Sequence, residues 1–288
     1  MPALIFFLSG LLAGSFLNAA AYRLPQGISM VKPRSHCPRC GRQLRAWENL
    51  PLLSWLLQAG RCRGCRAPIS LRYPLLEAAA GGIFLLAYKR LGLTPAVIEA
   101  CVLLAAWLAL IACDWEWRQL PDELTLGGLG LALVWSWWSG PAGAAGEAGV
   151  ARAAAGALVG AAAPAAVAGL YRLWRGREGL GMGDVKLMAM IGAFLGAAGA
   201  LLTLALAAMA GALLGVAMLA AVFFQRLRRA RRRGLAWHQS RARARRSAQA
   251  FFQRLPLPFG VLLAGMAMVS WLWGASLWHW YWQGLAGR

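Results

Sequence analysis

The sequence predicts an all-α polytopic membrane protein with about eight transmembrane helices and a small zinc-ribbon-like cytoplasmic domain inserted after the first helix. Three observations support this. Of the 288 residues, 60% are hydrophobic and 15 are tryptophans, a composition typical of polytopic membrane proteins and rare in soluble domains. Apolar segments of spanning length recur along the chain. The one sizeable polar stretch in the first half carries two Cys-x-x-Cys pairs.

Eight segments approach or exceed the roughly 20 apolar residues that a membrane-spanning helix needs. They are 2–22, 74–93, 95–113, 123–139, 148–171, 184–197, 199–222 and 257–281. The first begins without a basic region and is interpreted as a retained helix. The segments divide the chain into a first transmembrane helix (1–22), a cysteine-bearing cytoplasmic domain (23–73) and a seven-helix domain (74–288).

The formal charge of +20 follows the expected topology. Of the 30 lysines and arginines, 26 lie in the segments 23–72, 114–122, 172–186 and 226–254, which eight helices would place on one side of the membrane. The positive-inside rule makes that side cytoplasmic and puts both termini outside. The Arg-rich stretch 225–255 is expected to be a cytoplasmic loop that lies well against anionic lipid headgroups. No nucleic-acid partner is expected, because no binding module accompanies the arginines.

The cysteine pairs "CPRC" (Cys37, Cys40) and "CRGC" (Cys62, Cys65) are 21 residues apart. This spacing is similar to that of a zinc ribbon, in which four thiolates surround one structural Zn²⁺. A reducing compartment argues against two disulfides, and redox-active thiols are the alternative. Metal binding would supply most of the folding energy of so small a domain.

Only ten acidic residues are present, so a structural or functional role can be considered for each of them. Glu99 lies near an outer helix start, where a carboxylate suits the helix dipole. Five acids in loops or at helix ends are expected to be solvated: Glu48, Glu116, Glu123, Glu147 and Glu178. Glu77, Asp114, Asp122 and Asp184 remain.

Asp114 and Asp184 are the candidate catalytic pair. Asp114 ends an apolar helix, where negative charge opposes the helix dipole. Asp184 stands at the mouth of the apolar run "GLGMGDVKLMAMIGAFLG", although a carboxylate in hydrocarbon costs roughly 2.5 to 3.5 kcal/mol. Both would lie at the cytoplasmic edge of the membrane. Two acids that share one proton can activate water and protonate an amide oxygen, which is aspartic-protease chemistry and needs no cofactor.

Structural interpretations of the same residues stay open. Asp184 alone is a fair helix N-cap, and Asp122, after Pro121, suits the N-cap of the fourth span. The glycines on either side of Met182 could admit an extended backbone near the aspartate or could serve helix packing. Lys186 could hold a substrate carbonyl or carboxylate, or anchor its helix end at the membrane surface.

Five stretches, in this order, resemble those of prepilin peptidases, the type IV leader peptidase family of intramembrane aspartic proteases. They are "GSFLNAAAYRLP" (14–25), the cysteine-bearing stretch 35–77, "DWEWRQLPDELTL" (114–126), "GMGDVKLMAMIGAFLG" (181–196) and "LPFG" (257–260). Three features depart from the family pattern: Cys113 before the first aspartate, Val261 where a proline is common, and a long arginine-rich loop.

The resemblance implies two activities on prepilins and type II secretion pseudopilins. One is cleavage of the basic leader before the hydrophobic helix, and the other is methylation of the new N-terminal amine with S-adenosylmethionine. It places the catalytic pair on Asp114 and Asp184, with Asp122 as the fallback for the first position. It also implies a multi-pass protein of the bacterial inner membrane whose active site faces the cytoplasm.

The site for the methyl donor is less defined by the sequence. Asn18, Arg23 and Glu77 are polar groups where the first two spans meet the cysteine domain. They could line a cofactor or amine pocket, or be interfacial residues with ordinary hydrogen bonds. No glycine fingerprint of a Rossmann-type site is visible. Other open hypotheses are a peptidase without methyltransferase activity, an ion-coupled transporter, and a zinc-ribbon adaptor for nucleic acid or ribosomes.

Overall fold

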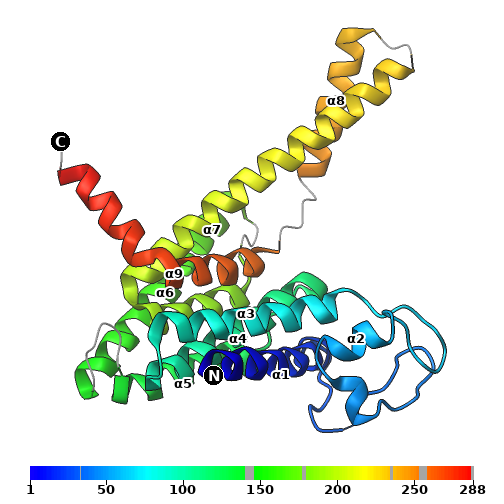
Figure 1. Ribbon diagram of the computed structural model, residues 1–288. Coiled ribbons are helices and arrows are strands. Elements are labelled where there is room, and N and C mark those ends of the chain that lie inside the picture. Colours follow the sequence, from blue (N-terminus) through cyan, green and yellow to red (C-terminus); the bar gives the residue numbers. More distant parts are fainter. Residues whose placement is uncertain (33, 140–145, 177–179, 234–235, 253–257, 287–288) are drawn as a thin grey trace.

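The computed structural model of the chain consists of helices and connecting segments, without a named strand in its described part (Figure 1). It describes residues 1–288 except 33, 140–145, 177–179, 234–235, 253–257 and 287–288. The α-helices are α1 (Pro2–Arg23), α2 (Leu53–Leu57), α3 (Arg72–Leu91), α4 (Pro95–Trp117), α5 (Asp122–Ser139), α6 (Gly146–Arg175), α7 (Met182–Arg232), α8 (Trp237–Phe252) and α9 (Phe259–Ala286). Two 3₁₀ turns, η1 (Leu24–Gln26) and η2 (Ala46–Asn49), lie between α1 and α2.

Each of the eight predicted apolar segments falls on a helix, and two of them share α7. The backbone of Gly196 is non-helical, with φ 74° and ψ 174°, a conformation that only glycine adopts readily. Gly196 therefore interrupts the long helix near the end of the predicted segment 184–197, two residues before the gap that precedes the segment 199–222. Five helices of the described residues are long and apolar enough to cross a membrane: Pro2–Gln26, Pro95–Trp117, Gly146–Arg175, Met182–Arg232 and Phe259–Leu277. The chain is a multi-pass membrane protein.

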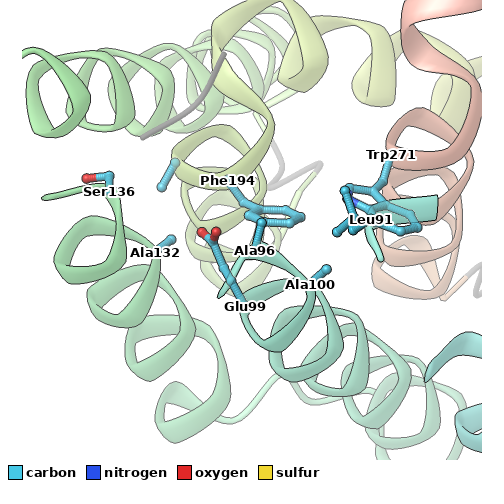
Figure 2. A pocket seen from close by; sticks show the side chains of 9 residues that line it. Leu91, Ala96, Glu99, Ala100, Ala132, Ser136, Phe194 and Trp271 are labelled. Carbon is cyan, nitrogen blue, oxygen red and sulfur yellow. The ribbon is translucent and has the colours of Figure 1, made fainter. Parts of the chain in front are cut away.

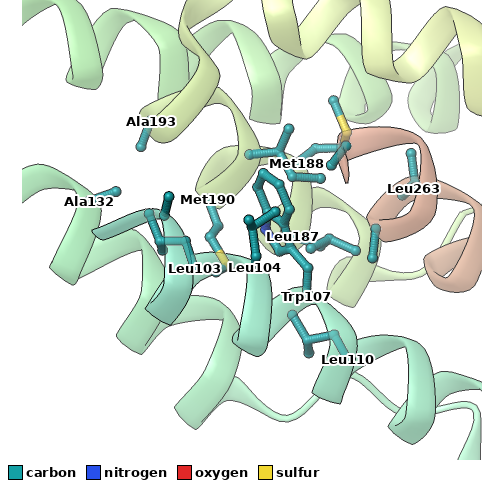
Figure 3. Close-up of a cluster of buried hydrophobic side chains, with 14 of the residues drawn as sticks. Leu103, Leu104, Trp107, Leu110, Ala132, Leu187, Met188, Met190, Ala193 and Leu263 are labelled. Atoms are coloured by element: carbon teal, nitrogen blue, oxygen red, sulfur yellow. The ribbon is translucent and has the colours of Figure 1, made fainter. Parts of the chain in front are cut away.

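The core lies where α4, α7 and α9 meet. Trp107 of α4 is fully buried beside Leu187 and Met188 of α7 and Leu263 of α9 (Figure 3). The ring of Phe194 meets that of Trp107 edge-on, with centroids 5.6 Å apart. These contacts fix the start of α7 against the second half of α4.

Helices α6 and α7 approach each other through glycines. A Cβ on Gly192 of α7 would lie 2.0 Å from the carbonyl oxygen of Gly156 in α6, and one on Gly156 would lie 2.1 Å from the oxygen of Gly192. Small residues allow such close approach in membranes, where packing rather than the hydrophobic effect holds helices together.

The cysteine domain occupies the segment between α1 and α3, at one end of the bundle (Figure 1). Within it, the prediction that Glu48 is solvated is wrong. Glu48 is buried, pairs with Arg42 at 2.6 Å and accepts a hydrogen bond from the Arg45 N–H at 2.8 Å. The bond to Arg42 lowers the pKa of Glu48, and the Arg45 N–H adds to this shift. Glu178 lies outside the described residues.

The arginine-rich stretch differs from the expected loop. Helix α7 continues to Arg232, and α8 packs back against it (Figure 1). Alanine and arginine are good helix formers, and the stretch 225–233 contains no glycine or proline to stop the helix. We call residues 226–252 the arginine hairpin.

Candidate active site

Asp114 lies in the last turn of α4 and is buried. Arg118 is the C-cap of this helix, with a left-handed backbone (φ 53°), and its N–H donates to the Asp114 carbonyl oxygen at 3.1 Å. The Asp114 Oδ2 atom accepts a hydrogen bond from the Val261 N–H at 2.9 Å. That N–H belongs to the first turn of α9, whose amides have no partner within their own helix. Asp114 therefore caps α9 from a distant part of the sequence.

Gly260 makes this contact possible. A Cβ at this position would lie 2.9 Å from the Asp114 Oδ2 atom and 3.1 Å from a Leu120 methyl carbon. The sequence showed "LPFG" only as a family-like motif and gave it no role. The feature of the sequence that could have indicated a role for this motif is a proline and a glycine at the start of an apolar helix. Leu257 lies outside the described residues.

Asp184 lies in the first turn of α7, and the interpretation of it as the N-cap is wrong. The N-cap is Gly181, with an extended backbone (φ −76°, ψ 151°), and its carbonyl accepts the Asp184 N–H at 3.1 Å. Among the described residues, no side chain donates to the Asp184 carboxylate. Its charged form is stabilised by the backbone N–H of Gly181 and by the positive end of the helix dipole.

The glycines on either side of Met182 have different surroundings. A Cβ on Gly183 would lie 3.1 Å from the Leu120 Cβ, whereas one on Gly181 would meet nothing closer than the Asp184 Oδ2 atom at 3.9 Å. Gly183 thus serves packing, and Gly181 leaves the approach to the aspartate open. Leu120 packs against both Gly183, next to Asp184, and Gly260, which contacts Asp114. Its side chain therefore lies between the two segments that carry or contact the aspartates.

Asp114 and Asp184 line one cavity of about 640 Å³. Its walls come from η1, directly after α1, the turn between α4 and α5, the start of α7 and the start of α9. The lining residues are Leu24, Pro25, Asp114, Arg118, Gln119, Leu120, Pro121, Asp122, Glu123, Gly181, Gly183, Asp184, Lys186, Pro258 and Phe259. The two candidate acids, 70 residues apart in sequence, are therefore brought to one solvent-accessible space.

Asp122 and Lys186 form an ion pair at this cavity. The Lys186 Nζ atom donates to Oδ1 of Asp122 at 2.7 Å and to Oδ2 at 2.8 Å. Asp122 is the first residue of α5 rather than the residue before it. The carboxylate of Asp122 is thus neutralised by the Lys186 cation, whereas the carboxylate of Asp114 accepts a hydrogen bond from a backbone amide. This difference makes Asp122 the weaker candidate for the first catalytic position.

The four predicted metal ligands converge. The Sγ atoms of Cys37, Cys40, Cys62 and Cys65 all lie within 4.8 Å of one another, and those of Cys37 and Cys65 are 3.9 Å apart. Zinc–sulfur bonds of about 2.3 Å give a tetrahedron with edges of about 3.8 Å. The donor set and its dimensions fit a metal ion.

Two similar turns present these thiols. The Gly41 N–H bonds the Cys37 carbonyl, and the Arg66 N–H bonds the Cys62 carbonyl, each at 2.9 Å. Gly41 and Arg66 both have positive φ. Backbone N–H groups of Cys65 and Gly64 lower the pKa of the Cys62 thiol to about 6, which favours the thiolate that binds metal, whereas burial and the neighbouring thiols raise the pKa of Cys65.

Asn18 and Glu77 are buried where α1 meets α3. The Asn18 side-chain amide donates to the Tyr73 carbonyl at 3.1 Å, and the Glu77 Oε2 atom accepts the Leu52 N–H at 2.8 Å. The Asn18 Oδ1 atom is buried without a hydrogen-bond partner. Arg23 donates to the carbonyls of Ser29 and Met30, so it orders the segment after α1.

A second, smaller cavity of about 170 Å³ contains one carboxylate. Glu99 points into it beside Phe194 and Ala132 (Figure 2). Neither Asp114 nor Asp184 lines it, so it does not offer the two-acid chemistry.

Comparison with known proteins agrees with this arrangement. Residues 8–91 match the bacterial peptidase A24 N-terminal domain, and residues 101–216 match the type IV leader peptidase family. No solved structure matches the chain significantly.

Three relatives, all named prepilin leader peptidase/N-methyltransferase, show how far the similarity extends. The protein from Myxococcus xanthus is 41% identical over 76% of this chain and 64% of its own length. The protein from Aeromonas salmonicida is 33% identical over 96% of this chain and 92% of its own. The protein from Pseudomonas putida is 35% identical over 73% of this chain and 78% of its own length. The similarity to the Aeromonas protein runs through both matched domains, and the chain therefore belongs to the type IV leader peptidase family.

Proposed function

We propose that the chain cleaves the leader from prepilins and type II secretion pseudopilins and then methylates the new N-terminal amine with S-adenosylmethionine. The observation that carries the peptidase proposal is the cavity that Asp114 and Asp184 share at the end of α4 and the start of α7. Two carboxyl groups at one water-accessible space can hold a single proton between them.

The environments of the two acids suggest their roles. Asp114 accepts an N–H bond from the start of α9, which stabilises its ionised form. We assign Asp114 as the general base and Asp184 as the acid that carries the shared proton. Water attacks the amide carbon as its proton moves to Asp114, and Asp184 protonates the amide oxygen. Asp114 then returns its proton to the departing amine while Asp184 regains its own, so the pair is restored.

The charge of the cavity suits a basic leader. With Asp184 holding the shared proton, the cavity is lined by three carboxylates, Asp114, Asp122 and Glu123. Two cations, Arg118 and Lys186, also line it, so its lining is negative. The rest of the chain is strongly basic, at +20 overall. A cationic leader is therefore favoured at the cavity although the net charge of the protein would repel it.

The cysteine cluster is proposed to hold a structural Zn²⁺. Cys37, Cys40, Cys62 and Cys65 would supply four thiolates, and the metal would hold the two knuckles of the domain together. Asn18 and Glu77 are our candidates for the methyl-donor or amine pocket. The buried Asn18 Oδ1 atom has no protein partner, so it is free to accept a bond from an amine. Arg23 would act indirectly, through the segment after α1.

The proposed location and orientation in the membrane rest on the distribution of positive charge along the chain. The segments that carry 26 of the 30 cations would face the cytoplasm of a bacterial inner membrane, with the cavity on that side.

One assay tests both activities. Purified protein in nanodiscs is incubated with a prepilin and S-adenosylmethionine, and the product mass reports leader loss and methyl gain. We expect Asp114→Asn and Asp184→Asn each to abolish cleavage, while Asp122→Asn retains measurable activity. Full cleavage by either of the first two variants would refute the assignment. Leader loss without methyl gain by the unaltered protein would identify a peptidase only.

A further inference from the structure

The arginine hairpin has no part in the proposed reactions. None of its residues lines the cavity of the two aspartates or belongs to the cysteine cluster. Between residues 226 and 246 it carries ten arginines and no acidic residue. So dense a charge repels itself, which calls for an anionic partner.

The packing of the hairpin turns all ten arginines outward. Leu227 and Ala230 of α7 and Ser240 and Ala244 of α8 are buried along the seam between the two helices. The arginines on either side of this seam are all exposed. In the described part of the chain none of them has a carboxylate partner. Two, Arg231 and Arg241, lie over the ring of Trp237 at 5.0 and 5.6 Å, an arrangement that ties the helices together and leaves guanidinium edges available.

The hairpin starts at the membrane surface. The apolar part of α7 reaches Phe224, and the first arginine is residue 226. The 16 residues of α8 make a helix about 24 Å long. Because α8 packs back along α7, we expect the hairpin to stay near the level at which the arginines begin. Figure 1 shows α7 leaving the bundle obliquely, which carries the hairpin out to the side of the bundle.

The exposed face argues for headgroup contact rather than insertion. Helices that lie within the interface need bulky apolar residues along one face, whereas the outward positions of the hairpin are mostly arginine. No lysine occurs in it, and the planar guanidinium suits phosphate oxygens better than an ammonium does. Clusters of basic residues just beyond a membrane span attract anionic lipids.

We propose that the arginine hairpin binds the phosphate headgroups of anionic phospholipids in the leaflet beside it. The leaflet is the polyanion that is always within reach of a hairpin tethered at its surface. A soluble acidic protein or a nucleic acid would have to be recruited, and the chain carries no recognisable nucleic-acid module. Binding would also restrain the long second part of α7.

The exposed arginines provide the assay, because each is a trypsin site. The full chain is placed in nanodiscs of phosphatidylcholine alone or of phosphatidylcholine with phosphatidylglycerol. We expect cleavage between residues 226 and 246 to be several-fold slower in the anionic discs, relative to cleavage after the exposed Arg63 and Arg66 in the cysteine domain. About 1 M salt should remove this protection, because it shortens the screening length to about 3 Å.

Matched variants locate the effect. Neutralising four exposed arginines of α8 (R241Q, R243Q, R245Q, R246Q) should remove protection of the remaining sites in α7. Neutralising four exposed cations of the cysteine domain (K32Q, R34Q, R39Q, R61Q) should not. Unchanged leader cleavage shows that each variant is folded. Equal digestion in both kinds of disc would overturn the proposal, as would protection in neutral discs that appears only with added RNA or polyglutamate.

Discussion

Asp114 lies where the end of one helix meets the start of another. At the C-terminus of α4 its charge opposes the helix dipole, but the first turn of α9 offers it an amide and the positive end of a second dipole. The cost of placing a carboxylate at the end of an apolar helix is thus offset by a helix that starts 145 residues later. Gly260 is the residue that admits this contact.

We therefore predict that Gly260→Ala slows leader cleavage by about 10- to 100-fold, because a shift of about 1 Å at a catalytic group can cost that much. The added methyl group would displace the Asp114 carboxylate and break its bond to Val261. The loss should appear in kcat with KM little changed, since the substrate-binding walls remain.

Gly265→Ala on the same helix is the control, because a Cβ there meets nothing within 4 Å. Methylation of a prepilin that has already been cleaved should be unaffected in both variants. A Gly260→Ala protein with normal kcat would show that the Val261 contact does not position Asp114.

The sequence was informative about individual acids because there were so few of them. An acid at an unfavourable helix end pointed to Asp114, and the shared cavity agrees with that hypothesis. The Val261 contact could not be predicted, since it joins residues 147 positions apart. Glu48 was misjudged for a similar reason: a loop position suggested solvent, but Arg42 and a backbone amide enclose its carboxylate.

At the scale of helices, the position of α7 depends on its contact with α6. Asp184 lies two turns before Gly192, whose Cα packs directly against the Gly156 carbonyl. A close backbone contact at this point holds the first half of α7 in register beside the α4 helix that carries Asp114.

We predict that Gly192→Ala destabilises the protein by about 1 to 3 kcal/mol, the usual cost of overpacking, and lowers cleavage by moving Asp184. Thermal unfolding in detergent and the cleavage rate would be measured together. Gly215→Ala on the same helix has room for a Cβ and should leave both unchanged. Equal melting temperatures for the two variants would argue against the glycine contact.

Helix boundaries were predictable where apolar length or glycine set them. The break at Gly196 falls within two residues of the predicted boundary between the spans 184–197 and 199–222, because only glycine takes its backbone conformation without strain. The sequence analysis did not predict the helices of the arginine hairpin, because the high density of charge was taken to indicate a loop. Arginine and alanine favour helix, and the small residues of the seam let α8 pack against α7.

In the whole molecule, two proposed activities occupy different places. The cavity of the aspartates takes Leu24 and Pro25 from η1 but no residue between 26 and 113. The cysteine cluster lies inside that interval. Helices α1 and α3 pack against α4 through a buried apolar cluster that includes Leu17 and Leu76. The exposed ion pair of Arg72, at the start of α3, with Glu116, near the end of α4, adds about 1 kcal/mol or less.

Removing the metal should therefore separate the two activities. Apparent zinc-binding energies of about 10 to 16 kcal/mol imply that a chelator, or Cys62→Ser, unfolds most of the segment 37–66. That segment supplies Leu52, whose N–H bonds Glu77, so methyl transfer should be lost. Leader cleavage should fall only a few-fold, because the bundle that holds Asp114 and Asp184 does not rest on the cysteine domain. Hydrogen exchange would locate the unfolding while product mass reports both reactions. Cleavage that disappears in step with zinc would mean that the domain shapes the peptidase cavity.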